Sequence, residues 1–226
     1  MNPLKSLRRI DSNLIRKCVD AFPFPPVGTA DETGLLAYGG DLSVERLVSA
    51  YAQGIFPWYN EEPILWYSPD PRMVLYPGEI HISRSLRASL RKKTYSFHIN
   101  KDFDSVISHC SSTRRDTGTW LNEEMIAAYI ELNRIGIAIS AETWQEGELT
   151  GGVYGLLLGN VFFGESMFFK TPDASKIAFV SMVSQLNEAG VQLIDCQVET
   201  DNLRRFGARL ISRRHFQNHL QEWVFI

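Results

Sequence analysis

The sequence has few cysteines and no long apolar run. Its three cysteines, at positions 18, 110 and 196, form no CxxC pair, so they predict neither a disulfide framework nor a zinc site. The longest apolar runs, such as Gly155–Leu158 and Val161–Phe163, are far shorter than the roughly 20 residues that cross a bilayer. Met1–Asp11 is polar and basic without an apolar segment, which indicates no secretory signal. We therefore expect a cytoplasmic protein with no membrane partner.

Familiar catalytic signatures are absent as well. Neither a GxSxG nucleophile elbow nor a GxxxxGKS phosphate loop occurs in the sequence. The five histidines show no HExxH or other ligand spacing, and the pair His215 and His219 has no evident third ligand. These absences argue against those chemistries, and we expect no metal ion.

The residues that are present can build a packed core, since 44% are hydrophobic and 22% are charged. The net charge of −3 does not favour nucleic acid by itself, but the positive charges are unevenly distributed. Arg84, Arg87 and Arg91 lie with Lys92 and Lys93 inside ten residues. This stretch predicts either a basic patch for an anionic partner or a solvated helix face.

The apolar periodicity predicts an α+β fold. Asn2–Ala30 has weak periodicity and a proline cluster, so we expect an extended segment there. Further prolines indicate a boundary near residues 60–80, which we place between a small N-terminal domain, residues 1–72, and a larger domain, residues 73–226. Helices are predicted after Ser43 and over Ser83–Lys93, Phe103–Cys110 and Asn122–Ile135.

Three strand-like runs follow, joined by short turns that connect antiparallel neighbours. The runs are Ile137–Gln145, Leu149–Leu158 and Val161–Phe169. A helix that ends at Gly190 and a buried strand, Val191–Val198, come next. This order resembles the core of the GCN5-related acyltransferase fold, with a mainly antiparallel sheet. A likeness in topology alone gives no function.

A carboxylate interrupts the third of these runs. Glu165 stands between aromatic residues, where a buried charge is costly unless it is paired. Strict strand alternation puts Glu165 and Met167 on one face, which predicts a pocket with an apolar floor and one polar anchor. The alternative is a glutamate at the strand edge that pairs with an arginine.

A second polar pair lies at the end of the last buried strand. Asp195 and Gln197 are two residues apart, so they are expected on one face of the strand, at the end where open sheets place their sites. Gln197 can orient a nucleophile but is a poor base, because an amide takes no proton at neutral pH. The pair therefore predicts the positioning of an amine. The alternative for Asp195 is a structural cap of the next turn, and Cys196 is expected in the core.

Nine short segments occur in the order in which the leucyl/phenylalanyl-tRNA–protein transferase family carries them, and together they resemble that family over roughly residues 22–216. The segments are Gly34–Ser43, Gly54–Tyr59, Pro63–Arg72, His81–Ser85, Gly118–Trp120, Gly151–Gly155, Phe163–Phe168, Ala174–Lys176 and Leu193–Gln197.

The resemblance implies an aminoacyltransferase that attaches leucine or phenylalanine, and methionine less well, to proteins that begin with arginine or lysine, marking them for degradation. It also implies a role for each matching position. Trp58 and Trp120 would hold the terminal adenosine of the aminoacyl-tRNA. The reacting groups would be surrounded by Glu165, Asp195 and Gln197. The amino-acid side chain would be enclosed by Phe162, Met167, Phe179, Met182, Leu186 and Ile194. The tRNA phosphates would be contacted by Arg84, Arg87 and Arg91.

No cofactor is expected for this chemistry, because an aminoacyl ester is already activated and needs neither ATP nor metal. Two rival functions fit the same fold less well. An acyl-CoA acyltransferase needs a glycine-rich pyrophosphate loop, where this chain has Lys170–Lys176 without glycine. A non-catalytic RNA-binding module would leave the predicted pocket without a use. Ile139 and Asn202 stand where the family usually has histidine, so the preference among leucine, phenylalanine and methionine stays open.

Overall fold

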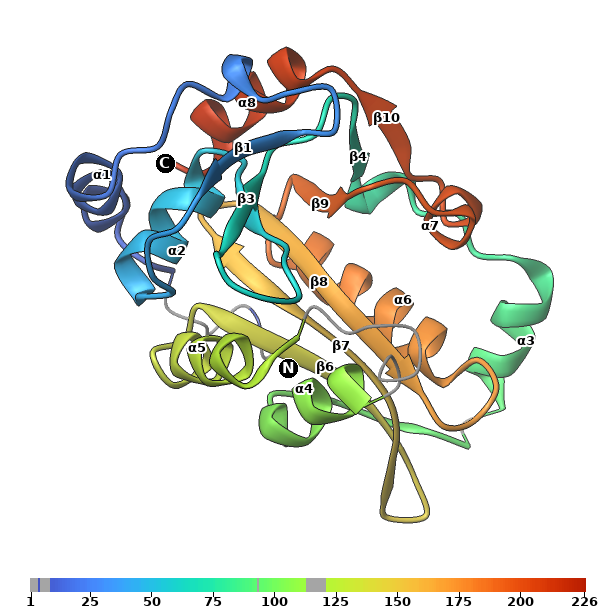
Figure 1. The fold of residues 1–226 in the computed structure, drawn as a ribbon. Coiled ribbons are helices and arrows are strands. Elements are labelled where there is room, and N and C mark those ends of the chain that lie inside the picture. Colours follow the sequence, from blue (N-terminus) through green and yellow to red (C-terminus); the bar gives the residue numbers. More distant parts are fainter. Residues whose placement is uncertain (1–3, 5–8, 93, 113–120) are drawn as a thin grey trace.

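The computed structural model describes residue 4 and residues 9–92, 94–112 and 121–226. Their centre is a seven-stranded sheet in the order β10-β4-β9-β8-β7-β6-β5 (Figure 1). Its strands are β4 (Arg72–Leu75), β5 (Ser96–Ile99), β6 (Ala138–Gln145), β7 (Glu148–Leu158), β8 (Val161–Phe169), β9 (Leu193–Gln197) and β10 (Arg209–Ile211). The predicted meander is confirmed, because β6, β7 and β8 are consecutive antiparallel neighbours.

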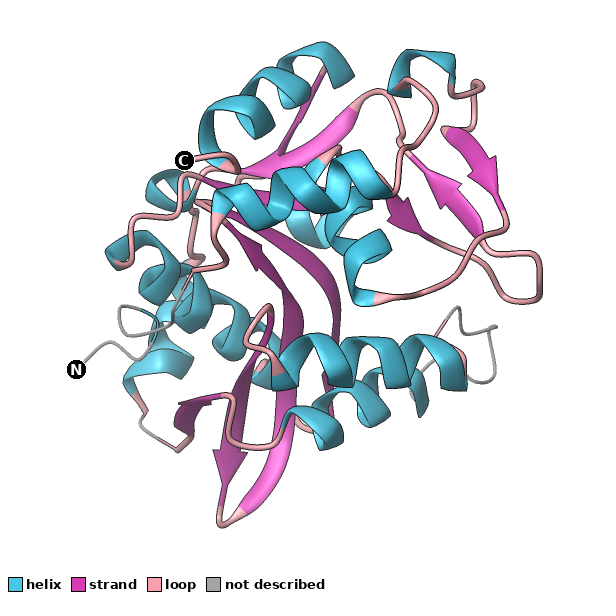
Figure 2. Cartoon of the chain, turned by 90° about the vertical axis from the view of Figure 1, so that its left-hand side faces the viewer, coloured by secondary structure: helices cyan, strands magenta, loops and turns pink. Residues whose placement is uncertain are grey.

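The fold is α+β, as predicted. Helix α6 (Ala174–Glu188) crosses from β8 to β9, which pair in parallel, while the other strand pairs of the sheet are antiparallel. On one face of the sheet, α6 and α3 (Arg84–Arg91) enclose an apolar core. Helices α4 (Phe103–Ser112) and α5 (Glu123–Arg134) cover the other face (Figure 2). The sheet thus separates two cores, and a side chain on β8 belongs to one or the other.

A smaller three-stranded sheet lies before β4 in the chain, in the order β1-β3-β2. It consists of β1 (Leu35–Tyr38), β2 (Phe56–Pro57) and β3 (Leu65–Tyr67). Helix α2 (Val44–Ala52) joins β1 to β2 and carries buried apolar residues into the same core as α4 and α5. Near the end of the chain, α7 (Asp201–Arg205) precedes β10 and α8 (Arg213–Trp223) follows it. Within the described residues, none of the helices is long and apolar enough to cross a membrane.

The expectation of an extended segment over Asn2–Ala30 is wrong, because this stretch contains helix α1 (Ser12–Ala21). Asp11 caps the helix by accepting a hydrogen bond from the backbone N–H of Asn13 at 2.8 Å. Ile15 and Cys18 are buried on the side of α1 that packs against α2. The proline cluster begins only after the helix has ended, so it does not oppose helix formation.

Candidate active site

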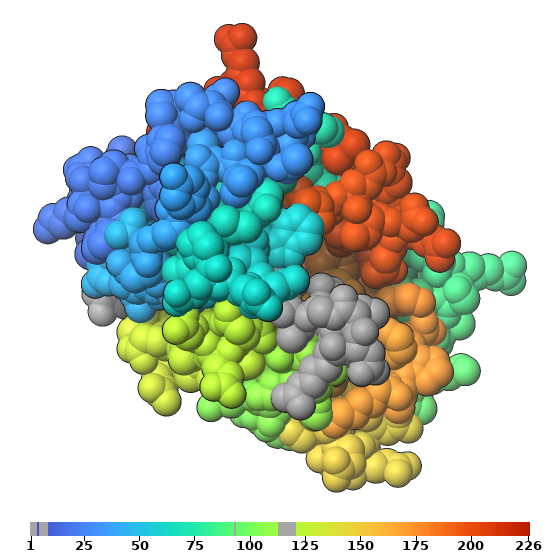
Figure 3. Space-filling model, in the orientation of Figure 1, coloured from blue at the N-terminus to red at the C-terminus, as the bar shows by residue number. Residues whose placement is uncertain are grey.

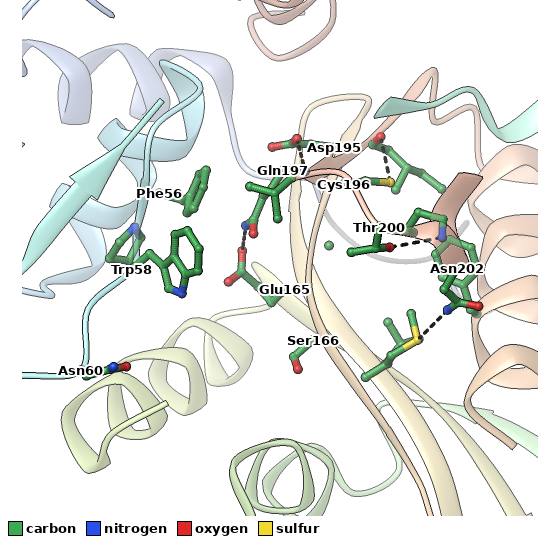
Figure 4. Close-up of a pocket in the computed structure, with 18 residues that line it drawn as sticks. Phe56, Trp58, Asn60, Glu165, Ser166, Asp195, Cys196, Gln197, Thr200 and Asn202 are labelled. Carbon is green, nitrogen blue, oxygen red and sulfur yellow. Dashed lines mark hydrogen bonds between the residues drawn. The ribbon is translucent and has the colours of Figure 1, made fainter. Parts of the chain in front are cut away.

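A pocket of about 730 Å³ opens where β8 and β9 separate. The two strands pair over only three positions, the last of which joins Phe163 to Asp195. Beyond that point the polar residues of both strands face a shared space instead of each other's backbone (Figure 4). Figure 3 shows the opening between the blue-green segment of β2 and β3 and the red C-terminal segment. The pocket is therefore a direct product of the short β8–β9 pairing.

A β-bulge in β8 sets which side chains reach this pocket. The register shifts between Tyr154 and Gly155 of β7, whose partners on β8 are Ser166 and Gly164, so Glu165 is the extra residue. The prediction that Glu165 and Met167 share one face is wrong for this reason. Glu165 bonds to residues of the core beneath α4 and α5, while Met167 packs against the core beneath α6. Both side chains still line the pocket, from opposite sides of β8.

Glu165 is the most strongly perturbed carboxyl group of the site. Its Oε1 accepts hydrogen bonds from the Tyr51 hydroxyl at 2.7 Å and from Gln197 Nε2 at 2.9 Å. Its Oε2 accepts a hydrogen bond from the Tyr129 hydroxyl at 3.0 Å. Burial raises the pKa of Glu165 to about 8, although the bonds from the two tyrosines and Gln197 act in the opposite direction. The group therefore changes its protonation state close to physiological pH.

The two tyrosines come from different parts of the chain. Tyr51 lies on α2 and Tyr129 lies on α5, and their hydroxyls are 2.5 Å apart. Burial raises the pKa of both phenols well above the ordinary value, so they act as hydrogen-bond donors and carry no charge. Sequence reasoning missed both residues. Each reads as one more apolar position in a helical stripe, and only the tertiary packing brings their hydroxyls to Glu165.

Asp195 forms a buried ion pair with Arg72 of β4, whose role was also missed. Arg72 Nε and Nη2 donate to the two carboxylate oxygens of Asp195 at 2.8 and 2.6 Å. The guanidinium lies 4.8 Å from the ring centroids of both Phe56 and Phe216. The sequence places Asp195 among the residues around the reacting groups, with a structural cap as the alternative. In the structure its carboxylate faces Arg72 and has no exposed surface.

Asp195 also fixes Gln197. Its Oδ1 accepts a hydrogen bond from the backbone N–H of Gln197 at 2.9 Å, and Gln197 has a left-handed backbone with φ of 61°. This local turn directs the amide of Gln197 to Glu165 (Figure 4). A continuous series of hydrogen bonds thus runs from Arg72 through Asp195 and Gln197 to Glu165.

The other side of the pocket is apolar. Of the side chains predicted to enclose an amino acid, Met167, Phe179 and Ile194 line it, together with Val153, which was missed. The remaining three, Phe162, Met182 and Leu186, are fully buried in the α6 core and are not part of the pocket wall.

Of the two predicted tryptophans, Trp58 lines the pocket and keeps 45% of its surface exposed. Trp120 lies outside the described residues. Cys196 packs against the α6 core as expected and also lines the pocket. Burial raises the pKa of the Cys196 thiol, which keeps it protonated and unsuited to nucleophilic attack.

The basic helix α3 exposes Arg84, Arg87 and Arg91 to solvent while Leu86 is buried beneath it. Arg87 also donates to the backbone carbonyl of Ile82 at 3.0 Å. Among the described residues, no group of three or more histidine, cysteine, aspartate or glutamate side chains is arranged to hold a metal ion.

Two family models match the chain. The model described as leucyl/phenylalanyl-tRNA protein transferase covers residues 74–221, and the model of the N-terminal domain of the same proteins covers residues 40–70. A leucyl/phenylalanyl-tRNA–protein transferase of Nitrosospira multiformis is 54% identical over 205 residues, which are 89% of this chain and 88% of that protein. A protein of the same name from Syntrophobacter fumaroxidans is 55% identical over 202 residues, 88% and 86% of the two chains. Among solved structures, a GCN5-related N-acetyltransferase from Kribbella flavida matches with a TM-score of 0.40 and 10% identity, over 70% of this chain and 57% of that one.

Proposed function

The chain belongs to the leucyl/phenylalanyl-tRNA–protein transferase family, and we propose that the pocket between β8 and β9 is where it moves leucine or phenylalanine from aminoacyl-tRNA to the N-terminus of a protein. One observation carries this placement. The pocket joins an apolar wall, which suits an uncharged side chain, to the hydrogen-bonded pair Glu165 and Gln197. An aminoacyl ester needs both surfaces side by side.

The reaction forms one bond and breaks another. The amine of the acceptor protein attacks the ester carbonyl, the C–N bond forms, and the bond from the carbonyl carbon to the ribose oxygen breaks. The amine loses a proton and the ribose oxygen gains one. The ionised form of Glu165 is suited to take up the amine proton, because a carboxylate whose pKa is about 8 is close in basicity to an α-amine.

Gln197 has a positioning role in this scheme. Its amide fixes Oε1 of Glu165, and it has no proton to accept or release at neutral pH. Arg72 and Asp195 act indirectly. Asp195 accepts a hydrogen bond from the backbone N–H of Gln197, and Arg72 holds the carboxylate of Asp195 in place. Alignment of an amine with an already activated ester supplies much of the rate enhancement that such an enzyme requires.

The apolar wall provides the selection of the amino acid. Val153, Met167, Phe179 and Ile194 offer no charged partner, which suits leucine and phenylalanine. The lower preference for methionine is carried over from the family resemblance. Met167 is flexible and unbranched, which suits a wall that accepts both a branched and a flat side chain. Phe162, Met182 and Leu186 support this wall from behind.

The tRNA is held at two places outside the acyl site. Trp58 stacks on the terminal adenine, for which its exposed ring is available. Arg84, Arg87 and Arg91 on α3 contact phosphates as point charges, which gives affinity that depends on salt and not on sequence. The role of Trp120 beside the adenosine belongs to the same proposal and rests on the family resemblance alone.

We further propose that the acceptor proteins begin with arginine or lysine, that the transfer marks them for degradation, and that it takes place in the cytoplasm. The boundary between a domain of residues 1–72 and one of residues 73–226 belongs to the same proposal. It is supported by the two family models, which end and begin at residues 70 and 74.

An acyl-CoA acyltransferase is disfavoured by the start of α6. Asp173 precedes the helix, forms an ion pair with Lys176 at 3.0 Å and accepts from Ser89, so a carboxylate occupies the place where a pyrophosphate would bind.

The test is a transfer assay with purified protein. Leucyl- or phenylalanyl-tRNA carrying a labelled amino acid is mixed with a peptide that begins with arginine, and label is expected on the peptide amine. A peptide with an acetylated N-terminus is the control and should receive none. Absence of transfer at low salt from folded protein would contradict the proposal.

A further inference from the structure

We propose that the Ser166 hydroxyl binds the 2′-hydroxyl of the terminal ribose of the aminoacyl-tRNA. This inference rests on the proposed function and assigns to Ser166 a role that neither the motifs nor the hydrogen-bond network around Glu165 accounts for.

Ser166 presents a buried polar group that the protein itself leaves unsatisfied. The residue is only 6% exposed, it lines the pocket, and its Oγ has no hydrogen-bond partner among the described residues. A buried hydroxyl without a partner costs about 1–3 kcal/mol. Since Ser166 lines the pocket, a substrate group that enters the pocket can supply this missing partner.

The position of Ser166 selects which substrate group this is. The bulge in β8 brings Glu165 and Ser166 onto the same side of the strand, opposite Met167. Figure 4 shows Ser166 directly below Glu165, on the flank of β8 that faces Trp58 and Asn60 and away from Thr200 and Asn202. Ser166 therefore lies outside the apolar wall, on the side of Glu165 that faces Trp58.

The chemical order of the substrate then places its ribose at Ser166. An aminoacyl-adenosine runs from the side chain through the ester to the ribose and ends at the adenine. With the side chain against Met167 and Phe179 and the adenine on Trp58, the ribose lies beside Glu165 and Ser166. The ribose offers a 2′-hydroxyl next to the ester oxygen, and two hydroxyls pair as donor and acceptor. This contact also distinguishes RNA from DNA.

The experiment uses two small esters, 3′-leucyl-adenosine and its 2′-deoxy analogue, with wild-type protein and Ser166→Ala. Removal of the 2′-hydroxyl also changes the reactivity of the ester, so the comparison between the two proteins decides. The wild type is expected to exceed Ser166→Ala about 3- to 10-fold in kcat/KM on the adenosine ester. On the deoxy ester the two proteins are expected to be equal.

A matched control is Ser68→Ala. The Ser68 hydroxyl is also buried without a partner among the described residues, but Ser68 does not line the pocket. This variant should transfer leucine like the wild type from both esters. Neither variant should lower the melting temperature of the free protein, since neither removes a hydrogen bond of the fold.

Three results would overturn the inference. The first is that Ser166→Ala loses kcat/KM equally on both esters, and the second is that it loses none on either ester. The third is that its melting temperature falls, which would reveal a structural partner of the hydroxyl. Failure of the proposed function itself is distinct, because wild-type protein would then transfer leucine from neither ester nor from leucyl-tRNA.

Discussion

A single side chain at this site can have hydrogen-bond partners from several helices and strands, and Glu165 is the clearest example. Its carboxyl group receives hydrogen bonds from α2, α5 and β9. Burial nevertheless dominates its titration and raises its pKa to about 8. The site therefore keeps a carboxyl group that is mostly protonated at pH 7 and can become a base with a small change in its surroundings.

The raised pKa gives a prediction for stability. Folded Glu165 holds its proton up to about pH 8, while the unfolded group releases it near the ordinary value of 4.5. The folded state thus binds more protons between these values, so this group's contribution to stability is complete below about pH 4.5 and is lost as pH rises through about 8. Glu165→Gln mimics the protonated form. Calorimetry would measure the melting temperature of Glu165→Gln minus that of the wild type at two pH values. This difference is expected to be a few degrees more positive at about pH 9 than at about pH 5.

The control for this measurement is Glu148→Gln on the exposed end of β7. The difference in melting temperature between Glu148→Gln and the wild type should be the same at both pH values. An identical result for Glu165→Gln would show that Glu165 is already ionised at the lower pH in the folded protein.

The Arg72–Asp195 pair gives a second prediction at this scale. Asp195→Ala leaves the Arg72 guanidinium buried without its partner, which typically costs about 3–5 kcal/mol of unfolding free energy. It also frees the backbone of Gln197, so transfer should fall far more than tRNA binding. Denaturant unfolding and filter binding measure the two effects. Asp195→Asn, which retains an acceptor oxygen for the Gln197 N–H, should lose less transfer than Asp195→Ala, and an equal loss of both would remove that hydrogen bond from the explanation.

At the scale of elements, the bulge in β8 depends on a glycine in its neighbour. A Cβ on Gly155 would lie 2.1 Å from the carbonyl oxygen of Phe163 and 2.6 Å from the Phe162 ring. Gly155→Ala must therefore shift β8 at the point where it presents Glu165, and should lower both the melting temperature and the transfer rate. Gly28→Ala is the control, because a Cβ there meets nothing within 4 Å. Full activity of Gly155→Ala would show that the bulge is not needed.

Helix α3 provides the other prediction at this scale. Replacing Arg84, Arg87 and Arg91 by glutamine should weaken tRNA binding and lower the slope of log affinity against log salt by about 0.7–0.9 for each phosphate that an arginine no longer neutralises. Transfer from 3′-leucyl-adenosine has no such phosphates and should be unchanged. Equal losses with tRNA and with the small ester would indicate damage to the fold.

The sequence predicts the elements that depend on local signals. Short turns fix the β6–β7–β8 meander, and apolar stripes fix the helices α4 and α5. The bulge was not predictable, because a one-residue shift reverses the faces of a strand and depends on Gly155 of the neighbouring strand. Helix α1 was missed because its apolar side is narrow and the prolines after it dominated the prediction.

The candidate site is predictable only in part, for a related reason. Glu165, Asp195 and Gln197 stand out because polar residues interrupt apolar strands. Tyr51 and Tyr129 do not, since they are 114 and 36 residues away from Glu165 and resemble ordinary core residues. Arg72 lies 123 residues before Asp195, and only the sheet order brings the two together.

For the whole molecule, the position of β4 has a consequence for protein synthesis. This early strand lies between β9 and β10, so its two neighbours are made more than a hundred residues after it. At roughly 5–20 residues per second, several seconds pass before Arg72 can meet Asp195. During that time the ribosome-bound chain lacks β9, which carries Asp195 and Gln197. With the roles proposed above, it therefore cannot modify the N-termini of the nascent chains around it. With these roles, catalytic competence begins only after β9 has been translated and has paired with β4.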